Sequence, residues 1–291
     1  MREAQYYNKH EDGKVECELC PRRCLIINNH LGICKIRKNI DGTLYSMNYG
    51  HISSISLDPI EKKPLNDYKK GSKVLSIGSI GCNLICEFCQ NWHIARAEFH
   101  ETTPKELDLT PETVVQMAID AVNLGNIGLA YTYNEPTVWY EFVYDTARLI
   151  KEAKLDNVFV SNGYINEKPI EKLLPFIDAF NIDLKGTDNT FYNRLTKADI
   201  DPVLQTIKLI VHSDKHLELT YLVIPGKNDD AIAFRYMINW LVNNAGTDFS
   251  LHINRYFPAY RMQISATPIE SLMNLAAIAR EYIPKVYIGN V

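Results

Sequence analysis

The stretch from Lys73 to Cys89 reads Lys-Val-Leu-Ser-Ile-Gly-Ser-Ile-Gly-Cys-Asn-Leu-Ile-Cys-Glu-Phe-Cys. Its first eight residues alternate in the way that is typical of a buried β-strand, and its last eight carry three cysteines at CxxxCxxC spacing. A tight loop directly after a strand can bring three sulfur atoms to one point. The stretch therefore predicts a strand that ends in a metal-binding loop.

The number of thiols in this loop indicates what it binds. A 4Fe-4S cluster held by Cys82, Cys86 and Cys89 keeps one iron without a protein ligand, whereas structural zinc and simple electron-transfer clusters take four ligands. Phe88 places a flat apolar surface beside that open iron. The alternative is a chance motif of buried core cysteines, but the preceding strand and the aromatic residue coincide with the spacing and favour the cluster.

The composition fits one large α/β domain, with or without a small appendage. The chain has 291 residues, of which 46% are hydrophobic, and a formal net charge of −4. It contains no long basic or acidic block, so it lacks the electrostatic signature of a nucleic-acid or membrane-surface protein. No apolar run approaches the roughly 18 residues that a membrane helix needs. We therefore expect a cytoplasmic protein with neither a nucleic-acid nor a membrane partner.

All seven cysteines fall in the first 89 residues, and their odd number suits metal coordination in a reducing compartment better than disulfide pairing. Four of them form a quartet that precedes the loop: Cys17, Cys20, Cys24 and Cys34. Four clustered thiols match either a structural zinc site or a second 4Fe-4S cluster, and the sequence leaves both open. His30 is a weaker fourth ligand, because an Asn-Asn-His run is more often a solvated loop. We expect a cysteine-rich metal-binding extension over 1–70 and a barrel domain over 71–291.

From Lys73 onward, strand and helix patterns alternate. The expected strands cover 73–79, 127–133, 157–161, 180–185, 217–225 and 249–257, with 286–289 as a further candidate. The expected helices cover 110–125, 136–154, 229–244 and 266–282, and the first begins at a capping Thr110 before Pro111. Repeated βα units predict a parallel sheet with right-handed crossovers. The expected fold is α/β, a partial (β/α)6 TIM-like barrel with its site at the carboxyl ends of the strands.

Polar side chains follow three successive strands of this barrel. The residues in question are Asn134 and Glu135, Ser161 and Asn162, and Asp183 and Lys185. Each pair also has a purely local explanation. The first pair could mark the start of a helix, the second could form a turn, and the third could be a surface ion pair. Because the carboxyl ends of parallel strands meet at one edge, their shared placement favours a single site near the cysteine loop.

The strand and the CxxxCxxC loop resemble those of the radical S-adenosylmethionine (SAM) enzymes. Within that superfamily, the chain resembles the activating enzymes of glycyl radical enzymes, including pyruvate formate-lyase activase. Three segments, Cys17-Glu-Leu-Cys-Pro-Arg-Arg-Cys24, Asp58-Pro-Ile-Glu-Lys-Lys-Pro-Leu65 and Gly81 to Trp92, together resemble the radical SAM member of the AmmeMemoRadiSam gene system. The chain ends at Gly289-Asn-Val, where we expect some relatives to continue with a short cysteine-containing tail.

The resemblance implies that the open iron chelates the amino and carboxylate groups of SAM, and that electron transfer from the cluster yields a 5′-deoxyadenosyl radical. It implies cofactor contacts from Phe88, Asn134, Glu135, Ser161, Asn162, Asp183 and Lys185. It also implies reduced flavodoxin or ferredoxin as the electron donor and a possible protein substrate. Asn134 replaces a glycine of the activase pattern, and the extra cysteines precede the loop rather than follow it. Both departures argue against transferring the activase substrate.

A second function of a different class remains open, namely a non-catalytic iron-sulfur electron-transfer protein or a zinc-stabilised interaction protein. The polar residues at the strand ends discriminate between the two, because an electron carrier has no need of Glu135, Asp183 and Lys185 beside an open iron. The sequence therefore favours a radical SAM oxidoreductase, and it leaves the substrate open.

Overall fold

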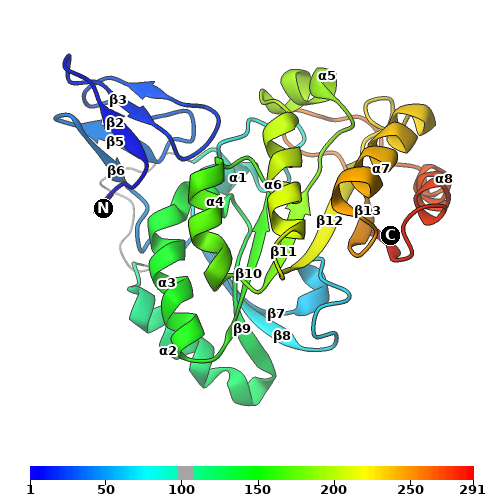
Figure 1. Cartoon of the computed structure of the whole chain (residues 1–291), viewed down its shortest axis with the longest axis horizontal. Coiled ribbons are helices and arrows are strands. Elements are labelled where there is room, and N and C mark those ends of the chain that lie inside the picture. The colour runs from blue at the N-terminus through cyan, green and yellow to red at the C-terminus, as the bar shows by residue number, and fades with distance from the viewer. Residues whose placement is uncertain (98–107) are drawn as a thin grey trace.

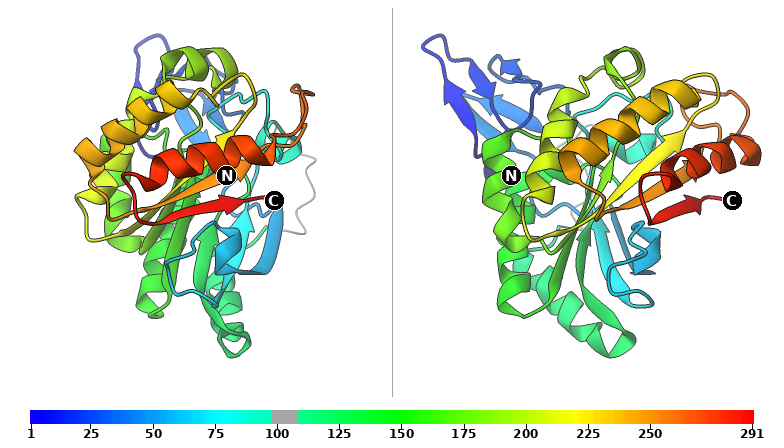
Figure 2. Two further views of the ribbon diagram at one scale, coloured as in Figure 1. Left: turned by 90° about the vertical axis from the view of Figure 1, so that its right-hand side faces the viewer. Right: turned by 45° about the vertical axis from the view of Figure 1, so that its right-hand side comes forward.

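The computed structural model describes residues 1–97 and 108–291, and its centre is an eight-stranded sheet. The strands are β7 (Ser54–Pro59), β8 (Lys73–Gly78), β9 (Asn126–Tyr131), β10 (Asp156–Ser161), β11 (Ala179–Asp183), β12 (His216–Val223), β13 (Ser250–Arg255) and β14 (Val286–Gly289). They lie side by side in chain order, and Figure 2 shows β14 in red at one edge and the blue β7 at the other. All seven expected strands are present and parallel, which confirms the α/β partial-barrel prediction.

The helices lie on the outside of this curved sheet (Figure 1). The longer ones are α2 (Pro111–Asp120), α3 (Tyr140–Glu152), α4 (Glu167–Leu173), α6 (Asp201–Val211), α7 (Ala231–Ala245) and α8 (Ile269–Arg280). Shorter pieces are η1 (Ile60–Lys62), α1 (Trp92–Ala95), η3 (Val122–Leu124), η4 (Pro136–Trp139), η5 (Leu174–Phe176), α5 (Asn189–Phe191) and the π-turn η6 (Tyr192–Thr196). Thr110 caps α2 as expected, since its hydroxyl oxygen accepts a hydrogen bond from the Thr113 N–H. None of the helices in the described ranges is both long and apolar enough to cross a membrane.

The N-terminal segment forms two small antiparallel sheets (Figure 1). One contains β1 (Arg2–Glu3), β6 (Thr43–Ser46) and β5 (Arg37–Ile40), and the other contains β2 (Tyr7–Lys9), β3 (Val15–Cys17) and β4 (Leu25–Ile26). The extension lies beside α3 and α4, because Arg37 forms a buried ion pair with Glu141 at 2.7 Å. The domain boundary at residue 70 stays a prediction, although β7 from the first range pairs with β8 from the second.

A buried carboxylate ties β12 to β13 and to the segment before β8. Glu218 is inaccessible to solvent and accepts hydrogen bonds from His216 and His252 at 2.8 and 2.6 Å. It also accepts from the backbone N–H groups of Asn66 and Asp67. Burial opposes ionisation, but these donors outweigh it and lower the pKa of Glu218 to about 2. The ionised carboxylate therefore stabilises the fold.

We expect this contribution to disappear in acid. A carboxylate whose pKa falls from near 4.5 to about 2 on folding stabilises the protein above pH 4.5, and this stability is lost as the pH falls towards 2. The loss amounts to about 3 kcal/mol. Urea unfolding at a series of pH values should show that Glu218→Gln removes this component of the acid dependence. Parallel pH profiles for the variant and the wild type would contradict the assignment.

Candidate active site

The cysteine loop begins where β8 ends, and Asn134 fixes its backbone. Gly81 has a φ of +90°, a left-handed conformation that favours glycine, and it stands directly before the first cysteine of the loop. The Asn134 side chain accepts a hydrogen bond from the Ser79 N–H at 2.9 Å. Its amide also donates to the carbonyl oxygens of Ile80 and Gly81, at 3.1 and 3.0 Å. The asparagine that departs from the activase pattern therefore holds the loop in place from β9.

The structure brings the residues predicted for this site to one cavity of about 350 Å³ at the carboxyl ends of the strands. Those that line it are Cys82, Cys86, Phe88, Cys89, Asn134, Glu135, Ser161, Asn162, Asp183 and Lys185. Phe88 is buried, and its ring centroid lies 6.0 Å from that of Phe191. The carboxyl ends of β8, β9, β10 and β11 thus contribute to one chamber, as expected for a partial barrel.

The three thiols of the loop are partly buried. Burial raises the pKa of Cys82 well above its usual range and that of Cys86 to about 12, and it also raises the pKa of Cys89. The Lys185 ammonium group opposes this rise at Cys86 and Cys89. Because a metal ligand must be the thiolate, Lys185 supplies the positive charge that offsets part of the cost of holding thiolates here.

Glu135 is a buried carboxylate that joins two strand ends. It accepts hydrogen bonds from the Ser161 hydroxyl at 2.7 Å and from the Asn162 backbone N–H at 2.9 Å. A third bond comes from the Thr137 N–H, which makes Glu135 the N-cap of η4. Burial raises its pKa, and these three donors pull it back. Glu135 therefore has its hydrogen bonds arranged before any ligand arrives.

Asn162 connects this carboxylate to the cysteine loop. Its side-chain amide donates to the Asn83 side-chain oxygen at 2.9 Å and lies 3.6 Å from the Cys82 sulfur. Its own side-chain oxygen accepts from the Tyr164 N–H. The Asn162 side chain thus lies near the Cys82 sulfur, while its backbone N–H donates a hydrogen bond to Glu135.

Asp183 and Lys185 lie on the same face of the chain and form an ion pair at 2.9 Å. Burial lowers the pKa of Lys185, but Asp183 and Cys86 outweigh burial, so the net shift is upward. The Lys185 backbone N–H also donates to the Tyr192 hydroxyl at 3.0 Å. Lys185 is therefore a firmly charged group at the wall of the cavity, and Asp183 holds its ammonium group.

A second charged cluster at this cavity was not predicted from the sequence. Asp58, on β7, accepts hydrogen bonds from Lys63 and from the Tyr133 hydroxyl, both at 2.8 Å. The Lys63 ammonium group lies 4.7 Å from the centroid of the Tyr133 ring. Tyr133 has a φ of +72°, a strained conformation for an aromatic residue. The signal in the sequence was the Asp58-Pro-Ile-Glu-Lys-Lys run, but only the antiparallel pairing of β7 with β8 brings it to the site.

The cysteine quartet lines a separate cavity in the N-terminal extension, together with Arg22, Arg37 and Asn83. All seven cysteines are free thiols. Burial raises the pKa of Cys17 to about 11 and moves those of Cys20 and Cys24 in the same direction. The structure therefore gathers the quartet as expected but separates it from the loop thiols. His30 donates from its ring Nδ1 to the Asn28 carbonyl oxygen and does not line this cavity.

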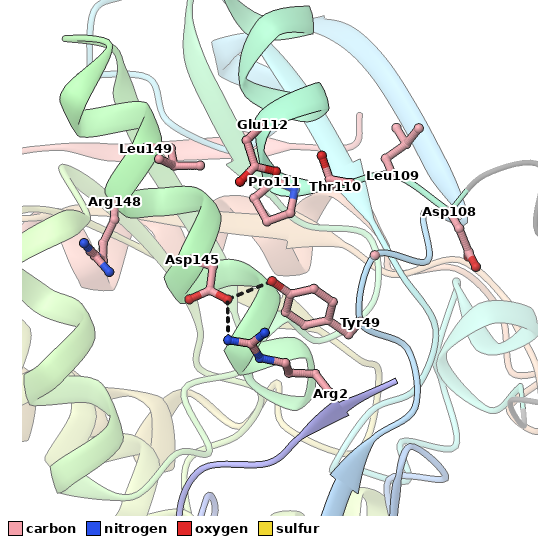
Figure 3. A pocket seen from close by; sticks show the side chains of 11 residues that line it. Arg2, Tyr49, Asp108, Leu109, Thr110, Pro111, Glu112, Asp145, Arg148 and Leu149 are labelled. Carbon is pink, nitrogen blue, oxygen red and sulfur yellow. Dashed lines mark hydrogen bonds and ion pairs between the residues drawn. The ribbon is translucent and has the colours of Figure 1, made fainter.

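A larger cavity of about 630 Å³ lies on the flank, between the N-terminus and the α2–α3 pair. Figure 3 shows that Arg2 and Tyr49 both point at Asp145, with Tyr49 donating a hydrogen bond at 2.7 Å. None of the residues predicted for a site lines this cavity. Size alone therefore does not identify the active site.

The donor set of the smaller cavity fits the groups that the sequence implies. Three thiols suit a 4Fe-4S cluster with one open iron, since no fourth cysteine is among the described residues that line the cavity. Lys185 offers a cation to a carboxylate, and Glu135 offers an anion to an ammonium group or a hydroxyl. The same cavity thus offers partners for both the cluster and an amino acid-bearing cofactor.

Comparison with known proteins agrees with this geometry. A model of the Radical SAM superfamily matches residues 76–234, which span β8 to α7. Uncharacterized protein MJ0808 of Methanocaldococcus jannaschii is 41% identical over 293 residues, covering 100% of this chain and 86% of that protein. The match to the family model begins within the strand that carries the cysteine loop.

Two more distant matches are to an activating enzyme and to a solved structure with the same fold. The (2S)-3-sulfopropanediol dehydratase activating enzyme of Klebsiella oxytoca is 24% identical over 119 residues, which cover 41% of this chain and 38% of that enzyme. The crystal structure of a radical SAM methyltransferase from Sphaerobacter thermophilus superposes with a TM-score of 0.58 at 16% identity. That superposition covers 76% of this chain and 67% of the methyltransferase chain, and it shows a shared fold.

Proposed function

Because this chain belongs to the radical SAM superfamily, we propose that it cleaves SAM reductively and uses the product to abstract hydrogen from a substrate. The family implies a 4Fe-4S cluster and SAM, and we assign the cluster to Cys82, Cys86 and Cys89. When bound, the reduced cluster supplies the electron that splits SAM into methionine and a 5′-deoxyadenosyl radical. The proposed electron donor is reduced flavodoxin or ferredoxin.

One observation carries this proposal, namely that three thiols share a cavity with a firmly charged lysine and a pre-arranged carboxylate. An electron-transfer protein requires neither Lys185 nor Glu135 in that position, so the arrangement favours the enzyme over a non-catalytic iron-sulfur or zinc protein. In this assignment Lys185 binds the carboxylate of SAM, and Glu135 accepts from its ammonium group or a ribose hydroxyl. Ser161 and Asn162 keep Glu135 oriented.

We expect Lys185→Met and Glu135→Gln each to weaken SAM binding about ten-fold to a hundred-fold. Loss of one charged hydrogen bond costs about 1.5 to 3 kcal/mol, which corresponds to that range. Calorimetric titration of cluster-loaded protein measures the affinity. Lys285→Met serves as the control, because Lys285 is exposed and does not line the cavity. Unchanged affinity in both variants, with lower stability instead, would remove these residues from the SAM pocket.

The substrate class that we propose is a protein glycine, a peptide or a small molecule, with chemistry similar to that of the activating enzymes. The distant match to a dehydratase activating enzyme supports activase-like hydrogen abstraction. The same cavity is also lined by Lys62, Thr220 and Asn254, which offer polar contacts to a substrate. Membership in the AmmeMemoRadiSam group stays a prediction.

Isotope transfer tests the proposed reaction. Anaerobically reconstituted full-length protein is mixed with reductant, SAM and candidate substrates deuterated at the position of abstraction, and 5′-deoxyadenosine is examined by mass spectrometry. A true substrate should place deuterium in 5′-deoxyadenosine. Formation of S-adenosylhomocysteine without 5′-deoxyadenosine, from fully loaded protein, would contradict the proposal.

A further inference from the structure

The quartet cavity holds an unsatisfied hydrogen-bond donor. Arg37 lines this cavity, is fully buried, and donates through one terminal nitrogen to both oxygens of Glu141 at 2.7 and 2.9 Å. Its Nε has no hydrogen-bond partner among the described residues. A buried donor without a partner costs about 1 to 3 kcal/mol. The cavity therefore presents four thiols and one spare N–H group, which together suit an anionic metal centre.

The spacing of the thiols argues against a single zinc ion. Zinc–sulfur bonds of about 2.3 Å in a tetrahedron place the sulfur atoms about 3.8 Å apart. Within residues 1–97 and 108–291, no three Cys, His, Asp or Glu side chains are close enough to hold one metal ion. The statement applies equally to the loop thiols, whose family binds a cluster. The quartet thus lacks a single-ion geometry among the described residues, as do the loop thiols that we assign to a cluster.

The quartet cavity and the loop share a wall. A Cβ atom at Gly81 would lie 2.9 Å from the Cys34 carbonyl oxygen, so the extension packs directly against the residue that precedes Cys82. Asn83 lines the quartet cavity and is bonded to Asn162 of the other cavity.

One cation of the quartet cavity also contacts the cysteine loop. Arg22 lines the quartet cavity and donates from Nε to the Asn83 carbonyl oxygen at 2.9 Å.

We propose that Cys17, Cys20, Cys24 and Cys34 bind a second 4Fe-4S cluster, that the Arg37 Nε–H donates a hydrogen bond to it, and that it exchanges electrons with the first centre across the Asn83 wall. In each exchange one centre loses a single electron and the other gains it. A low-potential one-electron donor protein replaces the electron that the enzyme consumes. The second site itself does not depend on the proposed function.

Metal analysis of the full chain lacking Cys82, Cys86 and Cys89 tests the site. This triple alanine variant is reconstituted anaerobically with iron and sulfide in the presence of equimolar zinc. We expect about four iron and four sulfide per chain, and a paramagnetic signal on reduction. About one zinc per chain without sulfide, or no metal at all, overturns the proposal.

A complementary variant covers the case in which the triple variant does not fold. Cys20→Ala/Cys34→Ala keeps the loop thiols and should bind about half of the iron of the wild type. Wild-type iron content in this variant overturns the proposal.

Arg37→Lys tests the hydrogen bond separately from the fold. Lysine keeps a cation opposite Glu141 but has no N–H group at the Nε position. In the triple alanine background, we expect the substitution to lower the reduction potential, because the lost hydrogen bond stabilises the more negative, reduced form. An unchanged potential overturns the role of Arg37.

Paramagnetic resonance of the reduced wild type tests the contact between the centres. Neighbouring reduced clusters should give a spectrum that differs from the sum of the spectra of the triple and double variants. A simple sum overturns the proposed exchange across Asn83, whereas metal in the triple variant would still locate the site.

Discussion

Glu141→Ala should lower the free energy of unfolding by about 3 to 5 kcal/mol, because it leaves a buried guanidinium group without a counter-charge. Both side chains of the Arg37–Glu141 pair are almost fully shielded from water. Glu141 also accepts from the Gln5 N–H at 2.8 Å, so its loss loosens the N-terminal extension from α3.

Urea unfolding of cluster-loaded wild type and variant measures this effect. Glu281→Ala is the matched control, since Glu281 also pairs with an arginine, Arg235, through both of its carboxylate oxygens but on the exposed surface. Solvent-exposed pairs contribute little, so the control should unfold close to the wild type. Equal effects of the two substitutions would show that burial of the Arg37 pair does not govern the attachment of the extension.

Cys86→Ala should reduce SAM cleavage to the background rate. Its thiol stands in the middle of the loop, and two remaining thiols are too few to hold a cluster in one orientation. Anaerobic reconstitution, followed by chromatographic quantification of 5′-deoxyadenosine, measures the rate. Circular dichroism checks that the variant is folded, and wild-type cleavage by the folded variant would refute the ligand assignment.

The strand order was predictable because every strand from β8 to β13 is an apolar run, and a helix pattern follows β8, β9, β12 and β13. The prediction missed β7, since the alternation in Ser54-Ile-Ser-Leu covers only four residues and the strand is defined by its antiparallel pairing with β8. It also missed α4 and α6. The pattern of α4 is short and contains Pro169, and α6 begins with Asp201-Pro202.

The convergence of the site residues could be predicted from topology, because parallel strands deliver their carboxyl ends to one edge. The hydrogen-bond partners of these residues could not be predicted. The sequence does not reveal that Asn134 clamps the cysteine loop, that Ser161 donates to Glu135, or that Tyr133 contacts Asp58. Each of these contacts joins residues from different elements, so each depends on the packed geometry rather than on local pattern.

The central claim is that three thiols hold a cluster whose open iron serves SAM. The most direct measurement is anaerobic incubation of the reduced, cluster-loaded chain with SAM, followed by quantification of 5′-deoxyadenosine against the variant that lacks Cys82, Cys86 and Cys89. The account predicts 5′-deoxyadenosine and methionine in equal amounts from the wild type and none from the variant. A fully loaded wild type that produces no more 5′-deoxyadenosine than the variant would contradict it.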